Sequence, residues 1–122
     1  MTFYLNLFVN SIPLLGVFGA EHIRPSEDQE TDVNIKEGEP VTLKCSYDSS
    51  SDYVYLYWYR QYPNRALQYL LDRGARSWSS YSNTADRRFE STATRISTEL
   101  RTTELRLSDT ALYYCALRVG AQ

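Results

Sequence analysis

The chain has 122 residues, of which 43% are hydrophobic, a size that suits one globular domain with a single core and is too short for two. Its 13 basic and 15 acidic residues leave a formal net charge of -2. Because no run of basic side chains is available to neutralise phosphates, nucleic acid is excluded as an expected partner.

The first element is an apolar leader over residues 1–20. It contains no charged side chain, is rich in Phe, Leu, Val and Ile, and is broken by Pro13, whereas charged residues begin at Glu21. It is short for a membrane-spanning helix with anchoring flanks, and small residues close to Ala20 offer a cleavage site. We therefore predict a secretory signal peptide over 1–20 and one domain over 21–122. An uncleaved amino-terminal anchor is the alternative, since no Lys or Arg precedes the apolar stretch.

The two cysteines, Cys45 and Cys115, are separated by 70 residues. In a chain that passes through an oxidising secretory route, a disulfide between them is the natural expectation. Two cysteines and the single histidine, His22, cannot supply the four ligands of a structural zinc site, and the sequence has no Cys-x-x-Cys redox pair. We expect no metal and no cofactor.

After a polar lead over 22–31, the sequence consists of short alternating segments separated by turn residues, which predicts an all-β domain. Alternation places Cys45 in the core and points Trp58 to the opposite side of its strand from Tyr59 and Gln61. Seven or eight short strands indicate a sandwich of two sheets. The predicted strands are 33–35, 41–47, 53–62, 67–71, 89–96, 98–107 and 111–117, with 73–83 as a loop or a weak edge strand.

Four features now occur at matching spacings: Cys45, Trp58 thirteen residues later, and the sequence Asp-Thr-Ala-Leu-Tyr-Tyr-Cys at 109–115, which carries Tyr113 and Cys115. Together they resemble an immunoglobulin variable domain. The resemblance implies a V-type two-sheet Greek-key sandwich in which the disulfide ties the sheets and Trp58 packs against it. It also implies that the hydroxyl of Tyr113 bonds the backbone near the turn before its strand.

The same resemblance implies a structural ion pair between Arg88 and Asp109 at the bottom of the sandwich, with the adjacent Arg87 as an alternative partner. Two features depart from the family pattern. Thr102 is polar where the family usually has an inward apolar residue, which leaves the register of that strand open. No Phe-Gly-x-Gly motif follows Cys115, so we expect the final joining strand to be absent.

Within the family, Trp-Tyr-Arg-Gln at 58–61 and Tyr-Cys-Ala-Leu-Arg at 114–118 look like a T-cell receptor alpha or delta variable segment. This implies an antigen-recognition domain of a receptor on the extracellular face of the plasma membrane. The alternatives are the V-type ectodomain of an innate immune or adhesion receptor and an antibody light-chain variable segment. We expect no enzyme, because the sole histidine lies in the polar lead and no nucleophile has a base near it in sequence.

The resemblance further implies pairing with a second variable-domain chain of beta or gamma type, because outward aromatic residues are otherwise a liability on a soluble surface. The alternative is that these aromatics pack within their own domain. The expected interface residues are Tyr59, Gln61, Leu67 and Tyr114, with Tyr69 as a further candidate.

The expected ligand is a peptide held by an MHC molecule or a related ligand, bound by loops at one end of the sandwich, and separate signalling subunits would contact regions outside this chain. The first loop is predicted at about 49–55, the second at about 73–80, and the third after Cys115. Aromatic rings and planar arginine donors suit such loops, although each residue could equally decorate a solvated loop. The candidate ligand-binding residues are Tyr53, Tyr55, Arg73, Arg76, Trp78 and Arg118.

Overall fold

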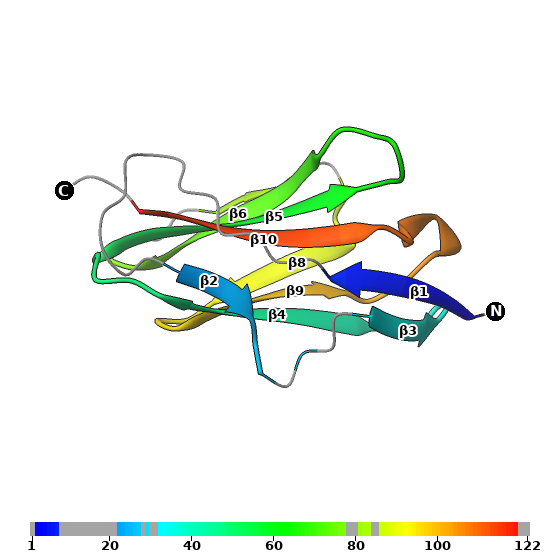
Figure 1. Cartoon of the computed structure of the whole chain (residues 1–122), viewed down its shortest axis with the longest axis horizontal. Coiled ribbons are helices and arrows are strands. Elements are labelled where there is room, and N and C mark those ends of the chain that lie inside the picture. The colour runs from blue at the N-terminus through cyan, green and yellow to red at the C-terminus, as the bar shows by residue number, and fades with distance from the viewer. Residues whose placement is uncertain are drawn as a thin grey trace.

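A computed structural model of the chain describes residues 2–7, 22–27, 29, 32–77, 81–83 and 86–119. These residues form two β-sheets packed face to face (Figure 1), as the alternating segments predicted. They contain no helix that is long and apolar enough to cross a membrane. The elements are β1 (Thr2–Leu7), β2 (His22–Pro25), β3 (Asp32–Lys36), β4 (Val41–Asp48), β5 (Tyr53–Gln61), β6 (Gln68–Arg76), β7 (Tyr81–Asn83), β8 (Phe89–Ala93), β9 (Ser97–Thr102), the 3₁₀ helix η1 (Leu107–Asp109) and β10 (Leu112–Val119).

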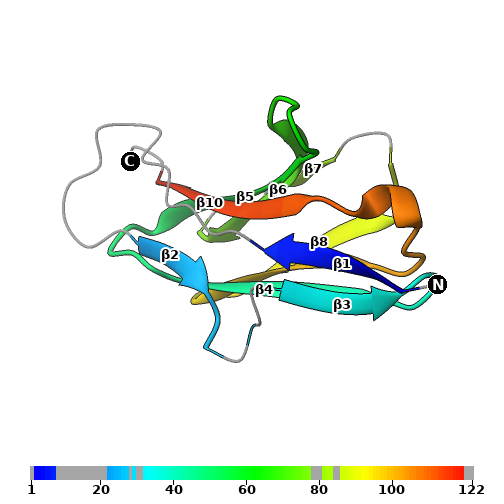
Figure 2. The same ribbon diagram turned by 45° about the vertical axis from the view of Figure 1, so that its right-hand side comes forward.

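The larger sheet has the strand order β3-β1-β10-β5-β6-β7, and the smaller has the order β2-β4-β9-β8. Neighbouring strands are antiparallel except β1 and β10, which are parallel through Asn6 with Leu112 and Leu7 with Tyr113. Figure 2 shows β1 lying between β3 and β10. The signal peptide over 1–20 stays a prediction: its residues 2–7 form β1, and residues 8–20 lie outside the described residues.

The core forms where the inward residues of the two sheets meet. Along β4 and β5 buried and more accessible residues alternate, so that Cys45 and Trp58 are fully buried. A disulfide joins Cys45 on β4 to Cys115 on β10, with their Cα atoms 6.7 Å apart, and so ties one sheet to the other. Cys115 also pairs with Trp58 across β10 and β5. The indole therefore lies next to the cross-link at the centre of the sandwich.

The polar atom of that indole is satisfied inside the core. Nε1 of Trp58 donates to Oγ1 of Thr98 on β9 at 3.1 Å, and the Thr98 hydroxyl donates to the carbonyl oxygen of Thr92. Thr98 is 1% exposed, so water does not replace it as an acceptor. A buried tryptophan N–H requires such a partner.

Thr102 faces inward and is buried, and it pairs with Val41 on β4, which fixes the strand register that its polarity left open. Its Oγ1 has no hydrogen-bond partner among the described residues. It lies in an apolar pocket lined by Val41, Phe89, Leu105 and Tyr113. The hydroxyl of Thr102 is thus desolvated without a compensating bond, which costs stability.

Two threonines on β9 therefore give a matched prediction. Thr98→Val keeps the shape but leaves the indole N–H of Trp58 unpaired, so the free energy of unfolding should fall by about 1–3 kcal/mol. Thr102→Val removes only an unpaired hydroxyl and should be neutral or stabilising. Urea unfolding of the two variants measures the contrast, and equal losses in both would show that the bond to Thr98 contributes nothing.

Several strand boundaries differ from the prediction. β8 ends at Ala93 and not at residue 96, and β10 continues to Val119, so the third loop does not begin directly after Cys115. The segment predicted as a polar lead contains β2. This strand was missed because Ile23 is the one deeply buried apolar residue of β2, which is too little for an alternating pattern. β6 extends to Arg76 instead of ending at residue 71, because its backbone pairs with β5 as far as Tyr53 even where its side chains are polar. β9 ends at Thr102 instead of 107, since the chain turns there toward η1.

Candidate functional site

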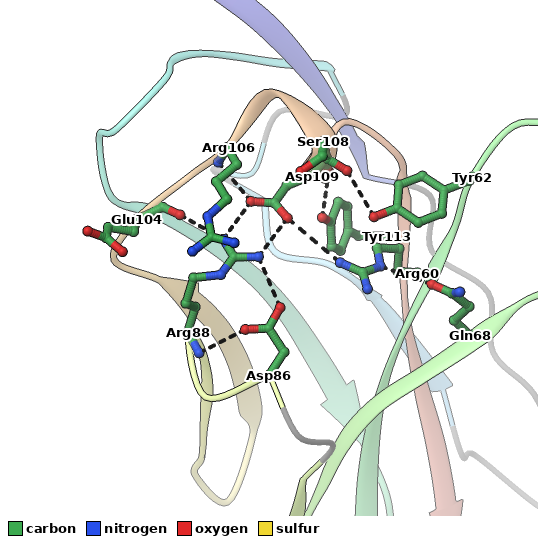
Figure 3. A network of polar contacts seen from close by, with 10 residues as sticks. All are labelled: Arg60, Tyr62, Gln68, Asp86, Arg88, Glu104, Arg106, Ser108, Asp109 and Tyr113. Atoms are coloured by element: carbon green, nitrogen blue, oxygen red, sulfur yellow. Dashed lines mark hydrogen bonds and ion pairs between the residues drawn. The ribbon is translucent and has the colours of Figure 1, made fainter.

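A polar cluster around Asp109 closes one end of the sandwich (Figure 3). Asp109 ends η1 and is 1% exposed. Nη1 and Nη2 of Arg88 donate to its two carboxylate oxygens at 2.8 and 3.0 Å, and the backbone N–H of Arg106 donates to Oδ2 at 2.8 Å. The ion pair implied by the family resemblance is thus formed by Arg88, a bidentate arrangement that adds geometric specificity, whereas Arg87 is exposed.

Two further charged residues join this cluster and were not predicted as members. Nη2 of Arg88 also donates to Oδ2 of Asp86 at 2.9 Å. Nη1 of Arg60 lies 3.8 Å from Oδ1 of Asp109, and its guanidinium lies over the rings of Tyr62 and Phe89 at 5.0 and 5.5 Å. Alternation along β5 places Arg60 on the same side of the strand as Trp58, but only the fold shows its counter-ion.

The electrostatics of the cluster favour charged Asp109 and neutral Tyr113. Burial opposes ionisation of Asp109, but the hydrogen bonds from Arg88 and Arg106 and the charges of Arg88 and Arg60 outweigh it, so its pKa lies below the ordinary value. Burial first, and then the charge of Asp109, raise the pKa of Tyr113. The neutral Tyr113 hydroxyl donates to the backbone oxygen of Asp109 at 2.6 Å, the contact that the family resemblance implied.

A second group of residues covers the outward side of the larger sheet. We call it the tyrosine face, and it consists of Tyr57, Tyr59 and Gln61 on β5, Leu67 just before β6, Tyr69 on β6, and Tyr114 on β10. Leu67 is 42% exposed and Tyr69 is 36% exposed, and the other members are half-buried. All the predicted interface residues therefore lie together on one accessible surface. Tyr57 was absent from the predicted set, although its alternation with Trp58 carried the signal.

Contacts within the tyrosine face hold its side chains in place. The rings of Tyr57 and Tyr59 stack with centroids 6.2 Å apart, and Tyr59 meets Tyr69 edge to face at the same distance. The hydroxyl of Tyr114 donates to Oε1 of Gln61 at 3.0 Å, and Nε2 of Gln61 donates to the carbonyl oxygen of Arg65 at 3.1 Å. The face is a pre-ordered aromatic surface.

Of the predicted loop residues that the structure describes, Tyr53, Tyr55, Arg76 and Arg118 lie toward the end of the sandwich opposite Asp109, on strands and not in loops. The first loop covers 49–52, so the predicted range of 49–55 was wrong because Tyr53 and Tyr55 already pair with β6. The second range, 73–80, was also too long, because Arg73 and Arg76 belong to β6. Trp78 lies outside the described residues.

Arg118 and Arg76 both place their guanidinium groups against other parts of their own chain. Arg118 on β10 lies over the ring of Tyr55 at 5.2 Å, and its Nη1 donates to the hydroxyl of Tyr57 at 3.4 Å. Arg118 thus joins the loop end to the tyrosine face. Arg76 instead directs its donors at backbone carbonyls of its own chain.

Comparison with known proteins agrees with this geometry. Residues 28–122 match the family model of the immunoglobulin V-set domain. The human protein "T cell receptor alpha variable 3" is 38% identical over 107 residues, which cover 81% of this chain and 82% of the relative. Human "T cell receptor alpha variable 8-6" is 37% identical over 114 residues, 93% of this chain and 98% of the relative. Human "T cell receptor alpha variable 38-2/delta variable 8" is 32% identical over 90 residues, 73% and 76% of the two chains.

Proposed function

Because this chain belongs to the T-cell receptor alpha and delta variable family of immunoglobulin V-set domains, we propose that it pairs through its tyrosine face with a second variable domain. The partner is a variable domain of a beta or gamma chain. The loop end of the pair binds a peptide held by an MHC molecule or a related ligand. The chain is a receptor domain and not an enzyme.

The observation that carries the pairing is the accessible aromatic surface on one side of the larger sheet. Leu67 and Tyr69 expose more than a third of their surface, and Tyr57, Tyr59 and Tyr114 stand beside them. Tyrosines are enriched at interfaces because a ring buries much apolar area at a small cost in conformational entropy. The stacking of Tyr57, Tyr59 and Tyr69 lowers that cost further, since the rings are already ordered before the partner arrives.

Gln61 supports the polar part of the same contact. Its amide has two N–H donors and two acceptor lone pairs on Oε1. One donor goes to Arg65 and one lone pair to Tyr114. The remaining donor and lone pair can bind one complementary amide, such as a glutamine of the partner domain. The two intramolecular hydrogen bonds fix the orientation of the Gln61 amide, and so the directions of its remaining donor and lone pair.

The ligand surface is proposed to include the strand ends around 49–52, with Tyr53, Tyr55, Arg73 and Arg118 as contact residues. Trp78 is retained in this proposal from the sequence alone. Large rings with few rotatable bonds and planar cationic donors suit recognition of a peptide and its carrier. Signalling subunits would contact parts of the receptor outside this domain, on the extracellular side of the plasma membrane.

A pairing experiment tests the tyrosine face. Leu67→Arg in a receptor chain that carries this domain should reduce assembly with a co-expressed beta chain at least tenfold, because pairing would bury an unpaired charge. Leu67 is exposed, so the domain itself should stay folded. Thr92→Arg, at an exposed position of β8, adds the same charge to the other sheet and is the matched control. Co-precipitation and surface staining measure assembly, and equal assembly by the two variants would refute pairing through this face.

A further inference from the structure

Arg76, at the end of β6, makes an unusual number of contacts with the backbone. Its Nη1 donates to the carbonyl oxygens of Ser49 at 2.6 Å and Ser51 at 2.8 Å, both in the first loop. Its Nε and Nη2 donate to the carbonyl oxygen of Arg95 at 3.2 and 2.8 Å, in the turn between β8 and β9. One guanidinium therefore bonds three carbonyls of two loops that lie more than forty residues apart in sequence.

The backbone of Arg76 is held in a conformation that side chains other than glycine rarely adopt. Its φ is +62°, in the left-handed region, where a non-glycine residue costs about 1 kcal/mol or more. Glycine would fit this position without that cost. An arginine here is therefore explained by what its side chain does and not by the shape of the turn.

Neighbouring contacts attach each of the two loops to the residues around Arg76. The guanidinium of Arg76 lies over the ring of Tyr47 at 5.2 Å. The Tyr47 hydroxyl donates to the carbonyl oxygen of Thr94 at 2.7 Å, and its backbone N–H donates to the carbonyl oxygen of Ile96 at 2.9 Å. The backbone N–H of Ser77 donates to the carbonyl oxygen of Asp52 at 2.9 Å. Arg76 thus stands where the first loop, β6 and the β8–β9 turn meet.

We infer that Arg76 is a positioning residue that couples the first loop, 49–52, to the turn at 94–96, so that the two move as one rigid unit. The coupling rests on these contacts and not on the proposed pairing or ligand. Within the proposed function this coupling has one consequence. The turn at 94–96, where Ile96 is 68% exposed, keeps a fixed position relative to the first loop at the ligand-binding end. From the sequence, Arg76 was a candidate for ligand contact or for a solvated loop position.

Amide hydrogen exchange of the folded domain, followed by NMR, tests the inference. Arg76→Gly relieves the backbone cost but removes the guanidinium. Exchange should accelerate at least tenfold at Ser51 in the first loop and Tyr53 just after it, and at Ile96 in the turn and Ser97 just after it. Core amides such as that of Leu43 should be unchanged. Arg76→Lys has a single donor group for three carbonyls and should give an intermediate acceleration. Unchanged exchange in either loop of Arg76→Gly would overturn the inference.

Asn64→Gly is the matched control, because Asn64 also has a left-handed backbone, with φ +56°, in a turn remote from these loops. It should leave exchange in both loops unchanged, which separates the effect of glycine from the loss of the guanidinium.

A double-mutant cycle distinguishes coupling from simple local support. Oγ1 of Thr94 accepts the backbone N–H groups of Ile96 and Ser97, so Thr94→Ala loosens the turn directly. With Arg76 present, this loosening should spread and accelerate exchange at Ser51 severalfold. In the Arg76→Gly background, Thr94→Ala should cause no further change at Ser51. Equal effects of Thr94→Ala on Ser51 in both backgrounds would show that Arg76 does not couple the loops.

Discussion

Replacing Cys45 and Cys115 together with alanine is expected to lower the free energy of unfolding by about 4 kcal/mol. The disulfide closes a loop of 70 residues, and its loss restores the conformational freedom of that loop to the unfolded chain. The bond also joins the two sheets beside Trp58, so its removal disturbs the packing at the centre of the core. A domain of this size has a total stability of only about 5–15 kcal/mol, so the variant should be close to unfolding at 37 °C.

Urea unfolding under non-oxidising conditions measures this loss. The reduced wild-type chain is the matched control, because it lacks the bond but keeps the two sulfur atoms and their volume. If the cross-link dominates, the reduced wild type and the double alanine variant should lose similar stability. A loss below about 1 kcal/mol in the reduced wild type would contradict a structural role for the disulfide.

Replacing Arg88 with alanine is the second change expected to have a large effect. It leaves the buried carboxylate of Asp109 with only the backbone N–H of Arg106 and the more distant Arg60. Breaking a buried ion pair from one side costs about 3–5 kcal/mol, and the remaining partners should keep the loss near the lower end. Arg87→Ala removes the adjacent exposed arginine and should change stability by less than about 0.5 kcal/mol. Similar losses in the two variants would show that the pair with Asp109 does not stabilise the fold.

The pH dependence of stability gives an independent measurement of the same cluster. The pKa of Asp109 in the folded domain lies below its value of about 3.9 in an unfolded chain. Its contribution is therefore fully present above about pH 5 and is lost as the pH falls below 4 through the folded-state pKa. Asp109→Asn should lower stability at pH 7 and flatten its decline below pH 5. A decline as steep as in the wild type would assign the acid sensitivity to other carboxylates.

The two-sheet fold and its disulfide-linked core were predictable because they depend on local periodicity and on the spacing of a few residues. Alternation in β4 and β5 indicated that Cys45 and Trp58 point inward, since a strand with one buried face admits only one register. The spacing of Cys45, Trp58 and Cys115 identified the family, and the tyrosine face followed from the opposite side of β5. These features require no knowledge of contacts between distant segments.

The parts that sequence did not predict depend on such contacts. Asp86 and Arg60 join Asp109 only because β5, η1 and the segment before β8 meet at one end of the sandwich. The planar donors of Arg76 made it a candidate for ligand binding, but the carbonyl oxygens that they bond belong to loops of its own chain. The length of β6 was missed for a related reason, since backbone pairing with β5 sustains a strand whose polar side chains read as a loop.

Hydroxyl-radical footprinting of the domain, alone and paired with a beta-type chain, tests the proposed interface most directly. Pairing through the tyrosine face predicts strong protection of Leu67 and Tyr69, the two members that are most exposed in the unpaired domain. Ile96, which is 68% exposed at the loop end, should stay reactive in the paired form without ligand. The proposal would be contradicted if Leu67 and Tyr69 were as reactive in the pair as in the single domain and if protection appeared on β8 and β9 instead.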